Sequence, residues 1–230
     1  MKMAHPLLSK PLCFDENRVQ VLVVEHPVQF RTCVFDLTAQ AGGEDRPFVF
    51  STHHCPLDGS EHLFVLSDYQ HLLTEDDRAL QSRFQKLLAQ TILEEMAPQS
   101  AALNSTIADF LGQLSVQVGY PMESFQGDYT LALLKWLKCR AAPEDAAPLG
   151  RLTEYLDLVS GLFSDVCFVL ISAHSYFCDR ELEILYQTAA YHKWNLLILE
   201  QRQNPTLPQE SVCIIDRQLC EIRLDETEKS

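Results

Sequence analysis

The sequence lacks the glycine-rich loop with which P-loop proteins bind nucleotides. The pattern GxxxxGK[ST] occurs nowhere in the 230 residues, which contain 8 glycines. A phosphate cradle of that kind needs a glycine-rich turn with exposed backbone N–H groups, together with a lysine. The serine-nucleophile pattern GxSxG is also missing. These absences exclude a standard P-loop nucleotidase and a standard serine hydrolase.

Paired cysteines and long apolar segments are missing as well. The 8 cysteines occur singly, without a CxxC pair, and isolated cysteines in apolar strands usually act as small hydrophobes in a reducing compartment. No apolar N-terminal segment follows Lys2, and no apolar run is long enough to cross a bilayer. We therefore expect a cytoplasmic protein without a membrane partner, whose cysteines have no catalytic role.

Basic residues are scarce. The chain has 18 Lys and Arg against 32 Asp and Glu, which gives a formal net charge of -14 at pH 7. Contacts to nucleic-acid phosphates need lysine or arginine to displace condensed counterions, so this charge argues against a generic nucleic-acid binder. If the protein binds DNA, its basic residues must gather on one surface, such as the lining of a hole.

Residues 165–200 predict a buried βαβ unit around which the rest of the chain is organised. The segments 166–171 and 196–199 are apolar runs without alternation, as expected of strands buried on both faces. Between them, Leu182 and Leu185 belong to an apolar stripe at helical spacing, after an acidic first turn. A right-handed crossover makes the two strands parallel.

The remaining patterns predict an α/β protein with a helical insertion. Three helices follow one another without an intervening strand, at 74–96, 105–114 and 128–140, inside a chain that otherwise mixes strands and helices. Further strands are expected at 19–24, 48–51, 63–66, 212–215 and 219–224, and further helices at 28–37 and 152–163. The expected parts are a mostly parallel α/β head at 1–72 and 150–224, a helical domain at 73–149 and a polar tail at 225–230.

The third helix of the insertion concentrates positive charge. Lys135 and Lys138 are one turn apart, Arg140 follows, and Trp136 belongs to an expected opposite apolar face. Cations near the carboxyl end of a helix complement its dipole, so a solvated helix end explains them as well as a phosphate-contacting face does. Both interpretations remain open on these residues alone.

A group of histidine and cysteine residues suggests a metal site at first sight. His53, His54 and Cys55 are adjacent, and neighbouring residues on an extended chain point to opposite faces, which disfavours convergence on one ion. His62 lies within reach in sequence. We expect a surface loop here.

Two polar positions follow predicted strands at the sheet edge where α/β proteins bind ligands. Asp68 is placed as a Walker B aspartate would be, but without a phosphate loop it is better explained as a turn residue. His174, between Ser172 and Ser175, is expected to be a hydrogen-bonded histidine at the sheet edge, not a base.

A series of apolar patterns and turns runs in order through nearly the whole chain: HPLL, VQVLVVEHP, FVFSTHHCPL, LFVLSDYQHLL, YTLALLKWL, CFVLISAHSYFCDRELEIL, LLILEQR, LP and VCIIDRQL. In their order and spacing, these patterns resemble the CRISPR-associated adaptation accessory proteins of subtype II-A systems, the Csn-two family. The resemblance implies an α/β head related to the RecA and P-loop fold without the Walker motif, and a projecting α-helical leg.

The resemblance also implies a function. Family members form a ring-shaped homotetramer with a lysine-lined hole through which ends of double-stranded DNA are threaded. They assist spacer acquisition, in antiviral defence, alongside the CRISPR integrase and the effector nuclease, and are not known as enzymes. The match to the family's basic helix places Lys135 at a DNA-contacting position, with Lys138 and Arg140 nearby.

Calcium ions that stabilise the ring are a further implication of the resemblance. In this sequence Ala132 and Leu133 stand where the family pattern has a carboxylate, which leaves Asp128 and, a little upstream, Glu123. Hard cations take six or more oxygens, so such a site would need backbone carbonyls, neighbouring subunits or water.

Two other classes of function remain open on the sequence. An acidic scaffold for partner proteins would leave the lysines as ordinary helix termini. A degenerate nucleotide hydrolase would use Asp68 and the segment 172–174 at the ligand edge of the sheet.

Overall fold

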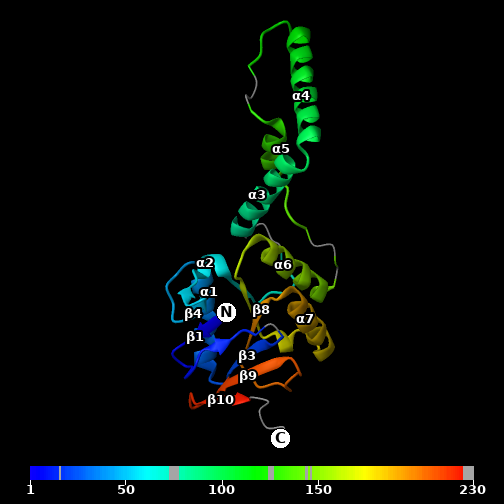
Figure 1. Ribbon diagram of the computed structural model, residues 1–230. Coiled ribbons are helices and arrows are strands. Elements are labelled where there is room, and N and C mark those ends of the chain that lie inside the picture. The colour runs from blue at the N-terminus through cyan, green and yellow to red at the C-terminus, as the bar shows by residue number, and fades with distance from the viewer. Residues whose placement is uncertain (16, 73–77, 124–126, 143–144, 146, 225–230) are drawn as a thin grey trace. The chain divides into compact units, whose positions relative to one another are not determined.

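The computed structural model describes residues 1–15, 17–72, 78–123, 127–142, 145 and 147–224, and the chain divides into two compact units (Figure 1). Unit 1 comprises Met1–Leu72 and Pro143–Ser230, and unit 2 comprises Leu73–Ala142. Every strand of the described residues lies in unit 1, together with helices α1, α2, α6 and α7. Unit 2 consists of α3, α4 and α5.

A six-stranded, mostly parallel sheet forms the centre of unit 1, which confirms the predicted α/β class. Its order is β10-β9-β3-β8-β7-β6, with β10 antiparallel to β9 and the other neighbours parallel. The predicted βαβ unit is β7, α7 (Asp179–His192) and β8. The strands are β3 (Val19–Val24), β6 (Leu63–Leu66), β7 (Cys167–Ile171), β8 (Asn195–Glu200), β9 (Glu210–Ile215) and β10 (Glu221–Leu224).

Helices cover both faces of this sheet, and that is why its central strands are continuously apolar. On one face, Cys33 and Leu37 of α1 (Pro27–Ala41) belong to the same buried cluster as Leu22 and Leu199 of the sheet. Figure 1 shows α6 (Pro148–Leu162) and α7 on the opposite face from α1. Their buried residues are Leu152, Tyr155, Leu156, Val159, Leu182, Leu185, Tyr186 and Ala189.

A small antiparallel sheet of order β2-β1-β4-β5 adds to the α1 side of the core. The sequence predicts β4 (Val49–Thr52) and also β2 (Leu12–Cys13), the first of two short strands expected on either side of a turn at residues 15–17. The strands β1 (Lys2–Ala4) and β5 (Cys55–Pro56) were not expected, because they have two or three residues each and show no periodicity. His53 and His54 join β4 to β5 with φ values of 51° and 66°. This conformation fits a tight primed hairpin turn, so both histidines have a structural reason for their position.

Unit 2 is built from α3 (Arg78–Glu94), α4 (Ala97–Val118) and α5 (Tyr129–Leu137). We expected Pro98 to end the first of these helices and Asn104 or Ser105 to cap the second, and this was wrong. Pro98 lies in the first turn of α4, where its missing N–H group has no intrahelical partner to lose. Gly119 ends α4 with a φ of 76°, a left-handed conformation that glycine adopts without strain.

The second boundary drawn from the sequence, at residue 149, falls within the first turn of α6, a helix of unit 1. The short helix α2 (Gly59–His62) was not expected. The sequence also suggests a capping box, formed by Thr74 and Asp77, at the start of the first inserted helix. These two residues and the tail at 225–230 lie outside the described residues. Among the helices of the described residues, none combines the length and the apolar character that crossing a membrane requires.

Candidate nucleic-acid interface

Helix α5, which bears the predicted basic residues, is held at its N-terminus by a polar network. Asp128 is the N-cap, and its carboxylate accepts hydrogen bonds from the backbone N–H groups of Thr130 (2.8 Å) and Leu131 (3.2 Å) and from the Thr130 hydroxyl. Asn104 of α4 donates its side-chain amide to Asp128 (3.1 Å) and accepts from the backbone N–H of Tyr129 (2.7 Å). Hydrogen bonds from Thr130 and Asn104 hold the pKa of Asp128 below its ordinary value.

Two further contacts hold α5 along its length. The buried hydroxyl groups of Ser100 in α4 and Thr130 in α5 are 2.6 Å apart. At the other end, Gln85 of α3 donates its side-chain amide to the backbone carbonyl of Cys139. Lys138, between that carbonyl and the helix, is the C-cap and adopts a left-handed conformation with a φ of 49°. Helix α5 is therefore tied to α4 where it begins and to α3 where it ends.

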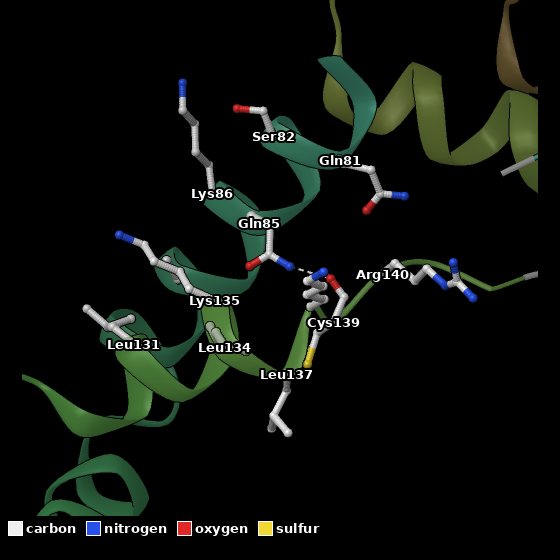
Figure 2. Close-up of a pocket in the computed structure, with 12 residues that line it drawn as sticks. Gln81, Ser82, Gln85, Lys86, Leu131, Leu134, Lys135, Leu137, Cys139 and Arg140 are labelled. Carbon is white, nitrogen blue, oxygen red and sulfur yellow. Dashed lines mark hydrogen bonds between the residues drawn. The ribbon is translucent and has the colours of Figure 1, made fainter. Parts of the chain in front are cut away.

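Helices α3 and α5 border an open groove of about 940 Å³ (Figure 2). Its wall is apolar in part, with Leu131, Leu134 and Leu137 among the lining residues. None of the described residues that line the groove is acidic, and four are cationic: Lys86, Lys135, Lys138 and Arg140.

The structure thus brings the three predicted basic residues together and adds Lys86 to them. Lys86 and Lys135 are exposed, and Figure 2 shows their side chains extending to the same side of the groove from α3 and α5. In a chain of net charge -14, this is a local concentration of positive charge of the kind that attracts phosphates. Sequence reasoning missed Lys86, because its neighbourhood with Lys135 depends on how two helices pack.

The apolar residues of α5 were placed wrongly by the sequence pattern. We expected Trp136, Leu134 and Leu137 on a face opposite the lysines. Leu134 and Leu137 instead line the same groove as Lys135 and Lys138, while Trp136 is 77% exposed and does not line the groove. The cause is helical spacing: Leu131, Leu134 and Lys135 stand at i, i+3 and i+4 and share one face of α5, whereas Trp136, five residues after Leu131, points to another side.

The two predicted metal ligands do not form a calcium site within the described part of the chain. Asp128 uses its carboxylate to cap α5, and Glu123 is exposed. Among the described residues, no group of three or more His, Cys, Asp or Glu side chains could hold a metal ion. Calcium takes six to eight oxygens, so these two residues alone do not fit it.

A second candidate location, the carboxyl end of the parallel strands, is closed by internal hydrogen bonds. After β7, the segment Ala173–Ser175 forms a single 3-10 turn, and its backbone N–H at His174 donates to the buried Glu200 carboxylate (2.9 Å). The imidazole of His174 lies 3.1 Å from Glu200 and 2.8 Å from Glu210, which also accepts the Tyr186 hydroxyl (2.7 Å). The Glu200 carboxylate therefore already accepts the hydrogen bond that this N–H group could otherwise donate to a ligand.

The charge of this buried cluster depends on His174. Burial lowers the pKa of His174, but hydrogen bonds and charges from Glu200 and Glu210 outweigh it and raise the pKa to about 9. A protonated imidazole then lies between two carboxylates, all three side chains being at most 4% exposed. Sequence reasoning expected a hydrogen-bonded His174 but not its acidic partners, because Glu210 stands 36 residues further along the chain.

The other polar candidates have local structural roles. Asp68 accepts backbone hydrogen bonds from Gln70 (2.9 Å) and His71 (3.2 Å), as a turn aspartate does, and these and the His71 side chain lower its pKa. The His62 ring is 2.9 Å from the backbone carbonyl of Ser164. Cys33 and Cys167 are buried, and burial raises the pKa of the Cys33 thiol to about 11. These positions offer no arrangement for catalysis that we recognise.

Comparison with known proteins does not assign the chain to a family. No protein-family model matches the chain, and a search of curated proteins finds no similar one.

Proposed function

We propose that this protein binds the ends of double-stranded DNA without catalysis and without reading sequence. The observation that supports this most is the groove of unit 2, which four cationic residues line and where no described lining residue is acidic. Lysine and arginine contacts to phosphates supply sequence-independent affinity, because they release the counterions condensed on DNA. The three cations predicted from the sequence, Lys135, Lys138 and Arg140, all belong to this set.

The overall charge supports binding at one surface only. With 32 acidic and 18 basic residues, the chain as a whole carries an excess of negative charge, which repels phosphate. DNA would then bind only where Lys86, Lys135 and their neighbours gather, as in the lysine-lined hole that the resemblance to the Csn-two family implies. Threading through a hole favours free ends over closed circles.

The proposal includes a homotetrameric ring, in which unit 1 is a head related to the RecA and P-loop fold and unit 2 is an inserted helical leg. Helix α4 offers a surface for a second copy of the chain. Its exposed side chains include Leu103, Phe110, Leu114 and Val118 at helical spacing, and Phe110 is 62% exposed. Asp109 is the single charged residue of α4, so two copies can pair there without the repulsion expected between chains of net charge -14.

The biological setting proposed is CRISPR spacer acquisition, with the integrase and the effector nuclease as partners. It rests on the sequence resemblance. Calcium belongs to the proposal only for the assembled ring, where neighbouring subunits or water would add oxygens to those of Asp128 and Glu123.

A nucleotide hydrolase is less well supported. Its candidate residues are Asp68 and the segment 172–174, but the Asp68 carboxylate accepts turn hydrogen bonds and the N–H of His174 points to Glu200. A bound phosphate would compete with a buried carboxylate for that donor. Turnover of ATP that Asp68→Ala abolishes would support this alternative.

The test compares linear duplex with relaxed closed circles of the same sequence in gel shifts, at low and moderate salt and with and without calcium. The mass of the protein is first determined by light scattering. We expect a tetramer that retards linear DNA, is released by salt and leaves circles unbound. Lys135→Glu should abolish the shift, whereas Lys10→Glu, an exposed lysine of unit 1, should not.

Two results would contradict the proposal. Circles bound as tightly as linear DNA would exclude threading from an end. The absence of any shift under all conditions would favour the acidic scaffold for partner proteins, with the lysines as ordinary helix termini.

A further inference from the structure

We infer that the groove between α3 and α5 holds unpaired terminal nucleotides of one DNA strand, an inference that rests on the proposed function and specifies its ligand. The dimensions are the first argument. Packed helices lie about 8–10 Å apart, whereas a DNA duplex is about 20 Å across. A groove of about 940 Å³ bordered by two such helices admits a single strand but not a duplex.

The chemistry of the lining is the second argument. A single strand presents phosphates along its backbone and apolar faces on its bases. Lys86 and Lys135 extend to one side of the groove, and Leu131 and Leu134 form part of its wall (Figure 2). Gln81 and Ser82 add neutral groups that both donate and accept hydrogen bonds, which suits base edges of any identity.

The distribution of charge favours a nucleic-acid strand over an acidic peptide. An acidic amphipathic helix also combines negative charge with apolar surface, but its charges gather on one face. The cations here come from both borders of the groove, with Lys86 on α3, Lys135 on α5 and Lys138 directly after α5. A ligand charged at every repeat of its backbone contacts all of them, as a phosphodiester chain does.

Paired and unpaired nucleotides at the DNA end would contact the groove differently. Duplex phosphates would meet the same lysines only from outside the groove, since the double helix is too wide to enter. A few unpaired nucleotides can instead lie inside it, where they contact the lysines from within and gain the contacts to the leucines. Ends with a single-stranded extension should therefore bind more tightly than blunt ends.

The experiment measures fluorescence anisotropy of the full chain with hairpin duplexes that have one free end, either blunt or with a five-nucleotide 3′ or 5′ extension. At low salt we expect at least one of the extended ends to bind about tenfold more tightly than the blunt end. Lys86→Glu should weaken the binding of blunt ends by the loss of one phosphate contact and should weaken extended ends more, so that the preference falls to about twofold or less. Lys10→Glu should leave the preference unchanged.

The outcomes separate this inference from the function on which it rests. Equal affinity for blunt and extended ends would overturn the inference and leave duplex-end binding intact. Loss of binding to every substrate would contradict the proposed function itself, and the inference with it. A preference for extended ends that survives Lys86→Glu, or competition by polyglutamate as strong as that by an eight-nucleotide thymidine strand, would show that the groove does not select a nucleic-acid strand.

Discussion

The side-chain amide of Gln85, in the middle of α3, donates a hydrogen bond to the backbone carbonyl of Cys139, the second residue after the end of α5. Cys139 lies between Lys138 and Arg140, so this bond holds the backbone between two of the four cationic residues that line the groove. Helix α5 has nine residues, too few to be stable alone, and depends on such contacts for its position.

Gln85→Leu should weaken DNA binding without changing the charge of the groove. The substitution keeps the volume of the side chain but removes the donor, and the loss of one such bond costs about 1 kcal/mol of unfolding free energy. We expect DNA affinity to fall severalfold while its salt dependence is preserved, because all four cations remain. Anisotropy at several salt concentrations measures both quantities.

Gln90→Leu is the matched control, since Gln90 is exposed on the same helix. If Gln85→Leu binds DNA as tightly as the unmodified protein, the hydrogen bond to Cys139 does not position the cations.

Substitutions of Asp128 distinguish a helix cap from a metal ligand. Asparagine caps a helix about as well as aspartate, whereas alanine at an N-cap costs about 1 kcal/mol. We therefore expect Asp128→Ala to lower the unfolding free energy by about that amount in urea, and Asp128→Asn to change it little, in calcium-free buffer. Equal losses in the two variants would mean that the negative charge, not the cap, is what the structure needs.

Much of the fold was predictable because its patterns are local. The continuous apolar strands β7 and β8 and the stripe of Leu182 and Leu185 between them indicate a βαβ unit without reference to any other segment. Pro98 was misjudged because proline ends one helix or begins another equally well, and only the neighbouring turns decide which.

The groove was predictable only in part, for a physical reason. Lys135, Lys138 and Arg140 are close in sequence, so their cluster could be seen. Lys86 joins them through the packing of α3 on α5, and Gln85 contacts Cys139 across 54 residues. Contacts between residues so far apart in the chain produce no periodic pattern that a single sequence could show.

The buried His174 cluster predicts a stability that falls at alkaline pH. The folded-state pKa of about 9 lies above the ordinary value of 6.5, so protonation of His174 stabilises the fold fully below pH 6.5, and this contribution is lost as the pH rises through 9. We expect a loss of about 3 kcal/mol of unfolding free energy over that range. Urea titrations at pH 6.5 and 9.5 measure it.

His174→Gln should flatten this pH dependence, because glutamine can donate a hydrogen bond to Glu200 or Glu210 but does not titrate. The variant should also be less stable than the unmodified protein at pH 6.5, since two buried carboxylates lose their counter-charge. The same pH dependence in both proteins would show that another group is responsible.

The apolar stripe of α4 predicts the effect of Phe110→Glu on assembly. Phe110 is 62% exposed in the single chain, so a charge there should leave the fold intact but disfavour pairing with a second copy. Light scattering should report a species smaller than the tetramer. Gln113→Glu, an exposed position on the same helix, is the control with the same charge change. A tetramer that persists in Phe110→Glu would place the subunit contacts elsewhere.

The most direct test of the central claim is the salt dependence of DNA affinity for the unmodified protein and for a variant with Lys86, Lys135 and Lys138 all replaced by glutamine. The slope of log affinity against log salt counts phosphate contacts, at about 0.9 per contact for duplex DNA. If the groove of unit 2 is the binding surface, the variant should lose most of its affinity and its slope should become shallower by at least about 2.7. A slope and affinity equal to those of the unmodified protein would show that DNA binds elsewhere and would contradict the account.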